Sequence, residues 1–319
     1  MKRFLALALA LVMVFAFTAC KKEETPDTTP DTPTEVEYKL GMGVSVSSAS
    51  SKTGNAQIDA TVATVVMDKD GKIVVCRIDV AQNKMNVTDG AVEATKAFET
   101  KMELGDRYGM AGIIDNNNDG VMKEWYEQTK AFEAYVVGKT GAEVSAIETQ
   151  EVNAHNIAVD EALLSAGCSM DITEFISAVS AACADAQGMT FKTADAFTLG
   201  VAAKTTAEES KAATAEENGL VAMYSDFAAC VIGTDGKILA TLNDAIQPKI
   251  TINAAGEIVE AAYKATKRNL KEEYNMATYG ASMDNNGDGK VLEWYVQSEA
   301  FSNNLPRDSR YNHRPQRFL

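Results

Sequence analysis

Two short loops carry an oxygen-rich spacing that could bind a metal ion. Each reads Asp-x-Asn-x-Asp-Gly, at residues 115–120 and again at residues 284–289. Oxygen ligands at positions one, three and five, followed by glycine, resemble the opening of a calcium loop. An EF-hand needs a glutamate at position twelve, whereas here it falls at position ten, so the spacing predicts a shorter, structural Ca²⁺ loop or, alternatively, an Asx-rich helix connection. The candidate Ca²⁺ ligands are Asp115, Asn117, Asp119, Glu124, Asp284, Asn286, Asp288 and Glu293.

A second chemistry-bearing segment reads SAGCSMDIT over residues 165–173 and leads into an amphipathic run. It combines hydroxyls, a thiol and a glycine directly before a helix. Asp171 and Glu174 stand where side chains satisfy the free N–H groups of a helix start, so a helix cap explains them. A ligand site at the same helix start is the alternative.

Other catalytic templates are absent from the composition. The chain holds only two histidines, His155 and His313, which excludes the usual zinc and Ser-His-Asp hydrolase patterns. Beyond Cys20, the four cysteines show neither metal-clip nor Cys-x-x-Cys spacing, so we expect small buried side chains. A formal net charge of −15 disfavours nucleic acid as a partner.

The elements that position these groups occur twice along the chain. Asp70-Gly71-Lys72-Ile73 recurs as Asp235-Gly236-Lys237-Ile238, and each of the two tryptophans, Trp125 and Trp294, follows one of the Asx loops. Such self-similarity predicts two units of the same architecture. We assign 38–187 to the first unit and 188–302 to the second, which ends before a counterpart of the first unit's closing helix.

Each unit reads as a hairpin followed by helices. Asp-Gly turns separate runs of β-branched and alternating residues, which is a hairpin signal. Apolar spacing predicts helices over about 92–108 and 257–274, a further helix after each Asx loop, a capped helix from Thr140 and a closing helix near Asp171. The fold class is therefore α+β, with antiparallel sheets packed against amphipathic helices.

The hairpin VVMDKDGKIVVCRIDV and the segment SAGCSMDITEFISAVSAA together resemble bacterial FMN-binding domains of exported lipoproteins. In that family a hydroxyl near the start of an alanine-rich helix is esterified by FMN phosphate, and tandem domains pass electrons outside the cell. Here Asp171 stands at the hydroxyl position and Cys168 at an alanine position, so the resemblance implies FMN held without that ester. The cofactor-binding candidates are Gly167, Cys168, Ser169, Asp171 and Thr173.

The N-terminus predicts export and lipid anchoring. Residues 1–19 combine a basic start, an apolar run too short to span a bilayer, and small residues before Cys20. We expect lipid on Cys20 and a Thr/Pro-rich tether over 20–37. The protein is then held at the outer face of the cell membrane.

The last residues, 303–319, change composition abruptly. They carry four arginines and two prolines in an otherwise acidic, proline-poor chain. This change favours a frameshift or truncation, with a native basic arm as the alternative.

Two functions are consistent with these residues. The first is a membrane-anchored carrier that binds flavin and passes electrons to a redox partner outside the cell. The alternative is a non-catalytic surface lipoprotein that binds a small ligand or a partner and is stabilised by Ca²⁺. No nucleophile–base pairing is visible, so the sequence predicts a carrier or binding protein rather than a hydrolase or transferase.

Overall fold

The first antiparallel sheet is built around the Asp-Gly hairpin expected from the sequence. In this computed structural model the described residues are 34–278, 284 and 287–305. The sheet has the order β3-β2-β1-β6. Gly71 adopts a positive φ at the hairpin turn, where Asp68 Oδ1 accepts the N–H groups of Asp70 and Lys72. The strands are β1 (Val36–Ser47), β2 (Asn55–Met67), β3 (Ile73–Asn86) and β6 (Met189–Thr193).

The second half of the folded unit Glu35–Leu319 forms a comparable sheet. Its order is β10-β9-β7, and a smaller sheet of order β12-β11-β8 continues beside it. The strands are β7 (Phe197–Thr206), β8 (Gly219–Ala222), β9 (Tyr224–Gly233), β10 (Ile238–Ile246), β11 (Lys249–Ile252) and β12 (Ile258–Ala262). A separate hairpin pairs β4 (Thr149–Val152) with β5 (His155–Ala158). The α+β class with antiparallel sheets is confirmed.

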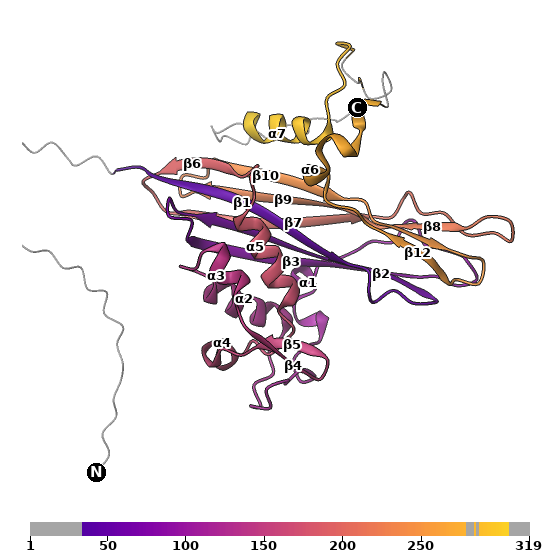
Figure 1. Cartoon of the computed structure of the whole chain (residues 1–319), viewed down its shortest axis with the longest axis horizontal. Coiled ribbons are helices and arrows are strands. Elements are labelled where there is room, and N and C mark those ends of the chain that lie inside the picture. Colours follow the sequence, from indigo (N-terminus) through magenta and orange to yellow (C-terminus); the bar gives the residue numbers. More distant parts are fainter. Residues whose placement is uncertain (1–33, 279–283, 285–286, 306–319) are drawn as a thin grey trace, which may run out of the picture. The chain divides into compact units, whose positions relative to one another are not determined.

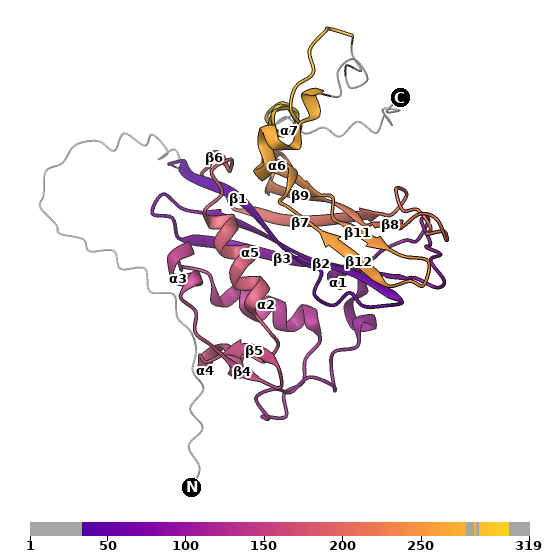
Figure 2. The ribbon, with the colours of Figure 1, turned by 45° about the vertical axis from the view of Figure 1, so that its right-hand side comes forward.

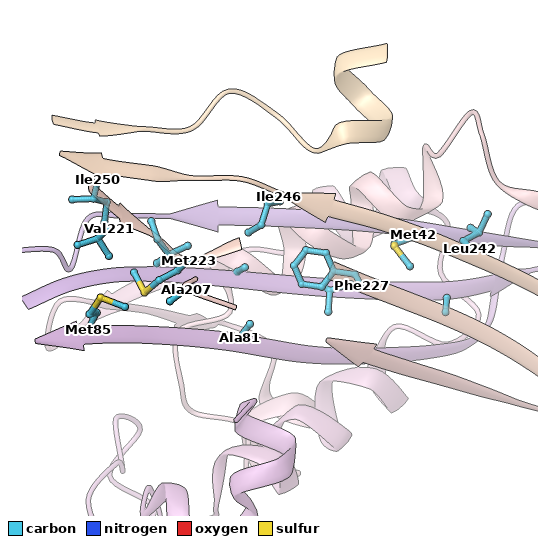
Figure 3. Close-up of a cluster of buried hydrophobic side chains, with 14 of the residues drawn as sticks. Met42, Ala81, Met85, Ala207, Val221, Met223, Phe227, Leu242, Ile246 and Ile250 are labelled. Atoms are coloured by element: carbon cyan, nitrogen blue, oxygen red, sulfur yellow. The ribbon is translucent and has the colours of Figure 1, made fainter. Parts of the chain in front are cut away.

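A shared apolar core lies between the two large sheets. Met42 and Ala81 of the first sheet and Phe227, Leu242 and Ile246 of the second belong to one buried cluster (Figure 3). Burying these side chains removes apolar surface from water, at roughly 25 cal/mol per Å². The two halves therefore stabilise each other through this core.

Helices cover the opposite face of the first sheet (Figures 1 and 2). Phe175 contacts Trp125 and Phe132 edge-on, with ring centroids 5.9 and 5.4 Å apart. The helices are α2 (Trp125–Tyr135), α3 (Gly141–Ser145), α4 (Glu161–Ser165) and α5 (Thr173–Cys183). The helices expected after the first Asx loop, at Thr140 and near Asp171 are present as α2, α3 and α5. The N-cap of α5 is Ile172 rather than Asp171.

Two expected helices are much shorter than the sequence suggested. Instead of a helix over 92–108, the chain forms α1 (Lys101–Leu104) and the 3-10 helix η1 (Gly105–Tyr108). The reason is Thr100, which is extended and caps the N–H of Glu103. Likewise 257–274 divides into β12, α6 (Lys267–Leu270) and η2 (Lys271–Tyr274), because Ile258–Ala262 pairs with β11.

Two further boundaries are set by pairing between distant segments. Strand β6, which follows residue 187, pairs with Val36–Leu40 and so belongs to the first sheet. The same pairing places the start of β1 within the segment expected to be a tether.

In the second half, α7 (Trp294–Asn304) packs beside β10, and Ser298 and Ser302 donate to Asn243 Oδ1. In the described part of the chain no helix is long and apolar enough to span a membrane.

Candidate functional site

A cleft of about 300 Å³ opens at one end of the first sheet, on its helical side. The sheet forms its floor, and the starts of α2 and α5, the segment after η1 and the tip of β5 form its walls. Its lining is both aromatic and polar, which is typical of a small-molecule site. The polar and aromatic side chains that line it are Ser47, Asp59, Thr61, Gln82, Lys101, Tyr108, Asn116, Trp125, His155, Asp171, Glu174 and Phe175.

Trp125 and Tyr108 give the cleft an aromatic wall. The Nζ of Lys101 lies 5.4 Å from the Trp125 ring and 4.9 Å from the Tyr108 ring. These are cation–π distances. Trp125 is only 2% exposed and packs edge-on against Phe175, so this residue belongs to the core as well as to the cleft. The wall is therefore rigid.

Asp59 lines the floor of the cleft. Its Oδ2 accepts a hydrogen bond of 2.7 Å from Gln57 Nε2. Its Oδ1 is buried and receives no hydrogen bond from any described residue. Because an unsatisfied buried carboxylate oxygen costs free energy, a ligand that donates a hydrogen bond there gains more than it would at the surface.

The cleft has an excess of negative charge. Three carboxylates, Asp59, Asp171 and Glu174, line the cleft together with one ammonium group, that of Lys101, and with the exposed His155. Glu174 accepts a hydrogen bond from Ser45, which anchors the start of α5 to β1. This charge balance favours uncharged or cationic ligands over anionic ones.

The segment expected to hold a cofactor is mostly part of the core. Gln128 Oε1 accepts the N–H groups of Ser169 and Met170, both at 3.0 Å. Burial raises the pKa of the Cys168 thiol to about 12, which makes the thiol unreactive. Gly167 is buried in a turn of positive φ, and Thr173 is exposed. Of the five candidates, Asp171 alone lines the cleft.

The start of α5 does not fit the phosphate of FMN. Asp171 Oδ1 accepts the N–H of Thr173 at 2.9 Å, and Oδ2 accepts the N–H of Asn156 at 2.8 Å. The carboxylate thus occupies the place where helix N–H groups would bind a phosphate, and it repels a second anion. The Ser169 hydroxyl is buried at the core side of this turn and is not available for an ester.

The oxygens of the first Asx loop organise the loop itself. Asp115 accepts the N–H groups of Asp119 at 3.1 Å and Gly120 at 3.0 Å, and Asn117 donates to Asp119. Glu124 instead accepts the N–H groups of Met110 and Ala111. It therefore anchors the segment after η1. Calcium binding at this loop stays a prediction.

The second loop repeats these contacts where it is described. Asp284 accepts the N–H groups of Asp288 and Gly289, and Glu293 accepts those of Met276 and Ala277. Asn286 lies outside the described residues. The described residues hold no group of three or more metal-ligating side chains.

The predicted signal peptide, the lipidated Cys20 and most of the tether fall within 1–33, outside the described residues, as do 306–319 of the basic tail. Sequence reasoning singled out Trp125 and His155 but missed Asp59 and Lys101 as members of one site. Asp59 stands in a long strand, and no local pattern distinguishes it from a solvated strand residue.

Comparison with known proteins gives one partial relative. No family model matches the sequence, and no solved structure matches it. A chlorophenol reductase of Desulfitobacterium hafniense is 34% identical over 101 residues, which cover 27% of this chain and 29% of the relative. The chain thus matches less than a third of that relative's length. The similarity is local and does not place the whole chain in a family.

Proposed function

We propose that this protein is a lipid-anchored, extracytoplasmic binding protein whose cleft takes a flat small molecule. The observation that carries the proposal is the pairing of an aromatic wall, Trp125 and Tyr108, with the unsatisfied Oδ1 of Asp59. The wall supports a planar ring, and the carboxylate selects a ring that donates a hydrogen bond. The predicted export signal supports the location outside the cell.

The chemistry of the cleft narrows the ligand class. A phenol is flat, uncharged below its pKa, and presents one hydroxyl donor. The name of the partial relative, a chlorophenol reductase, supports a halogenated phenol as the first ligand to test. We propose binding alone, without a reaction step.

A flavin is the second candidate, supported by the aromatic wall and by the resemblance to FMN-binding domains. The isoalloxazine ring is flat and carries an N–H donor. The negative charge of the cleft and the occupied start of α5 favour riboflavin, which has no phosphate, over FMN. Electron carriage to a redox partner would follow if the flavin were bound.

Tryptophan fluorescence tests the proposal in the full chain. The W294F variant leaves Trp125 as the reporter, and W125F leaves Trp294 as the matched control. We expect 4-chlorophenol or riboflavin to change the emission of the W294F variant saturably and to leave that of W125F unchanged. FMN should bind more weakly than riboflavin.

The D59N variant tests the carboxylate. Loss of a charge-assisted hydrogen bond is worth roughly tenfold or more in affinity. D226N is its control, because Asp226 is an exposed carboxylate on β9 outside this cleft. Equal affinities in D59N and the parent chain, or quenching that persists in W125F, would remove the cleft as the binding site.

A further inference from the structure

In the described part of the chain, no helix packs across β7 and β9 as α5 packs across β1 and β2 of the first sheet. The aligned Asp-Gly turns match Ala63, Val65 and Met67 of β2 with Ala228, Cys230 and Ile232 of β9. The three β2 residues are 0, 0 and 4% exposed. Ile232 is 41% exposed, Ala228 is exposed and Cys230 is half-buried. We name Gly200, Ala202, Ala228, Cys230 and Ile232 the open face.

The helix beside the open face also lacks the aromatic neighbour that its counterpart has. In the first half, Phe175 of α5 packs between Trp125 and Phe132, and Phe132 is fully buried. The residue aligned with Phe132 is Phe301 of α7, which is 55% exposed. A hollow of about 320 Å³ beside Trp294 includes Ala202 and Ala228. Trp294 aligns with Trp125, whose ring packs against Phe175 in the first half.

The strand under α5 shows what this face is shaped to accept. A methyl group on Gly41 would meet the carbonyl oxygen of Ala182, so the glycine lets the α5 backbone rest on β1. The aligned residue of β7 is Gly200, where an added methyl would meet nothing closer than the Cys230 carbonyl oxygen at 3.9 Å. Gly200 thus leaves room for a helix backbone that the described residues do not supply.

Charge at the edge of the open face gives the orientation. At the start of α5, Glu174 accepts a hydrogen bond from Ser45 of β1. The residue aligned with Ser45 is Lys204, which is exposed and lies opposite the exposed Asp226 of β9. An acidic residue in the first turn of a docked helix would therefore meet an ammonium group, and acidic residues also favour that end of a helix.

We propose that the open face docks an α5-like helix of a partner protein. The helix carries an acidic residue in its first turn, an aromatic residue next to it, and alanine-sized residues three and seven positions after the aromatic residue. These match Glu174, Phe175, Ala178 and Ala182 of α5. Ala202 stands where β1 has Gly43, which contacts the α5 backbone, so the docked helix lies farther from the sheet at this point than α5 does.

A labelled peptide tests the docking surface on the full chain. The probe is residues 171–185 with Cys183 replaced by serine and fluorescein at its N-terminus, followed by anisotropy. We expect saturation below about 1 mM. G200A should weaken binding about tenfold because its methyl meets the helix backbone, whereas A202G should strengthen it. V259A changes an exposed residue of β12 and is the control.

Two changes in the peptide and one in the protein separate the contributions of the aromatic ring and of the charge. Replacing Phe175 by alanine in the peptide should weaken binding about tenfold, since the hollow beside Trp294 is then left unfilled. K204E should weaken binding of the original peptide by roughly two- to fivefold, and E174K in the peptide should restore it. Peptide affinity unaffected by G200A, A202G and the Phe175 change would overturn the proposal.

The Cys230 thiol gives an independent readout. Its alkylation rate, followed by mass spectrometry of the peptide that contains it, should fall when the probe binds. Protection that grows with protein concentration without any probe would instead assign the open face to a second copy of this chain and overturn the partner-helix proposal. An unchanged alkylation rate of Cys230 at saturating probe would also overturn the partner-helix proposal.

Discussion

Gly41 and Gly200 form a matched pair of positions at which the same substitution should have opposite effects. Both are strand glycines at aligned positions of β1 and β7. A methyl group at Gly41 would overlap the carbonyl oxygen of Ala182 and lie 3.5 Å from the Cβ of Asp185. At Gly200 the nearest atom would be 3.9 Å away. We therefore expect G41A to destabilise the protein and G200A to leave it unchanged or slightly more stable.

The magnitudes follow from packing and chain entropy. Overpacking costs about 1–3 kcal/mol, and the upper end applies at Gly41 because the obstacle is helix backbone that cannot change rotamer. Replacing glycine lowers the entropy of the unfolded chain, which stabilises by about 0.4–1 kcal/mol at either position. The net expectation is a loss of about 2 kcal/mol for G41A and a gain of about 0.5 kcal/mol for G200A.

Urea unfolding followed by tryptophan fluorescence measures this difference. Trp125 lies in the core that α5 helps to form, and Trp294 reports on the second half. With m-values of about 2–3 kcal/mol per M, the G41A midpoint should fall by roughly 1 M relative to the parent chain. The G200A midpoint should move by no more than about 0.3 M upward.

Equal midpoint shifts for G41A and G200A would contradict both expectations. Such a result would mean that α5 moves away from β1 at little cost, and that close backbone contact at Gly41 does not hold the helix in place. A large loss for G200A alone would show that the open face is covered in solution.

Three further outcomes are expected. Burial raises the pKa of Glu133 from its ordinary 4.5 to about 7, so the folded state binds more protons than the unfolded state between these pH values, and the free energy of unfolding should fall by up to about 3 kcal/mol as pH rises from 4.5 to 7. Urea unfolding of the parent chain and of E133Q at several pH values isolates this dependence. Parallel pH profiles of the two proteins would contradict it. R268A breaks the buried ion pair with Asp185, whose Nη1–Oδ2 distance is 3.2 Å, and should lower the free energy of unfolding in urea by about 3 kcal/mol. A decrease below about 1 kcal/mol would show that water replaces the cation. D115A removes the acceptor of two loop N–H groups, so the melting temperature should fall by about 2–4 °C, equally in calcium buffer and in chelator. A fall in melting temperature confined to calcium buffer would establish an ion site.

Local patterns determined much of the fold. The Asp-Gly turns, with Gly71 and Gly236 both at positive φ, fixed the two hairpins because few other residues adopt that backbone. The apolar spacing after the first Asx loop and the capping box at Thr140 located α2 and α3, since both signals act within one or two helical turns. These features need no tertiary contact to be visible.

Tertiary contacts decided what the residues near 100 and 260 became. The helical spacing over 92–108 was overridden by Thr100, whose extended conformation is held beside Asp79 of β3, where Asp79 Oδ1 accepts the N–H of Met102. Residues 258–262 became a strand because β11 offers a pairing edge. Propensity is a weak preference, and a distant hydrogen-bonding partner outweighs it.

The cleft could not be read from the sequence, although parts of it could. Trp125 and Asp171 stood out individually, yet Asp59, Lys101 and Asp171 come from β2, α1 and the turn before α5 and are separated by tens of residues. The packing of α5 across the first sheet brings them into one cleft. The sequence determined which side chains exist and which local elements carry them, and the tertiary structure decided which of them meet, because pairing and packing between distant segments are set by the whole core.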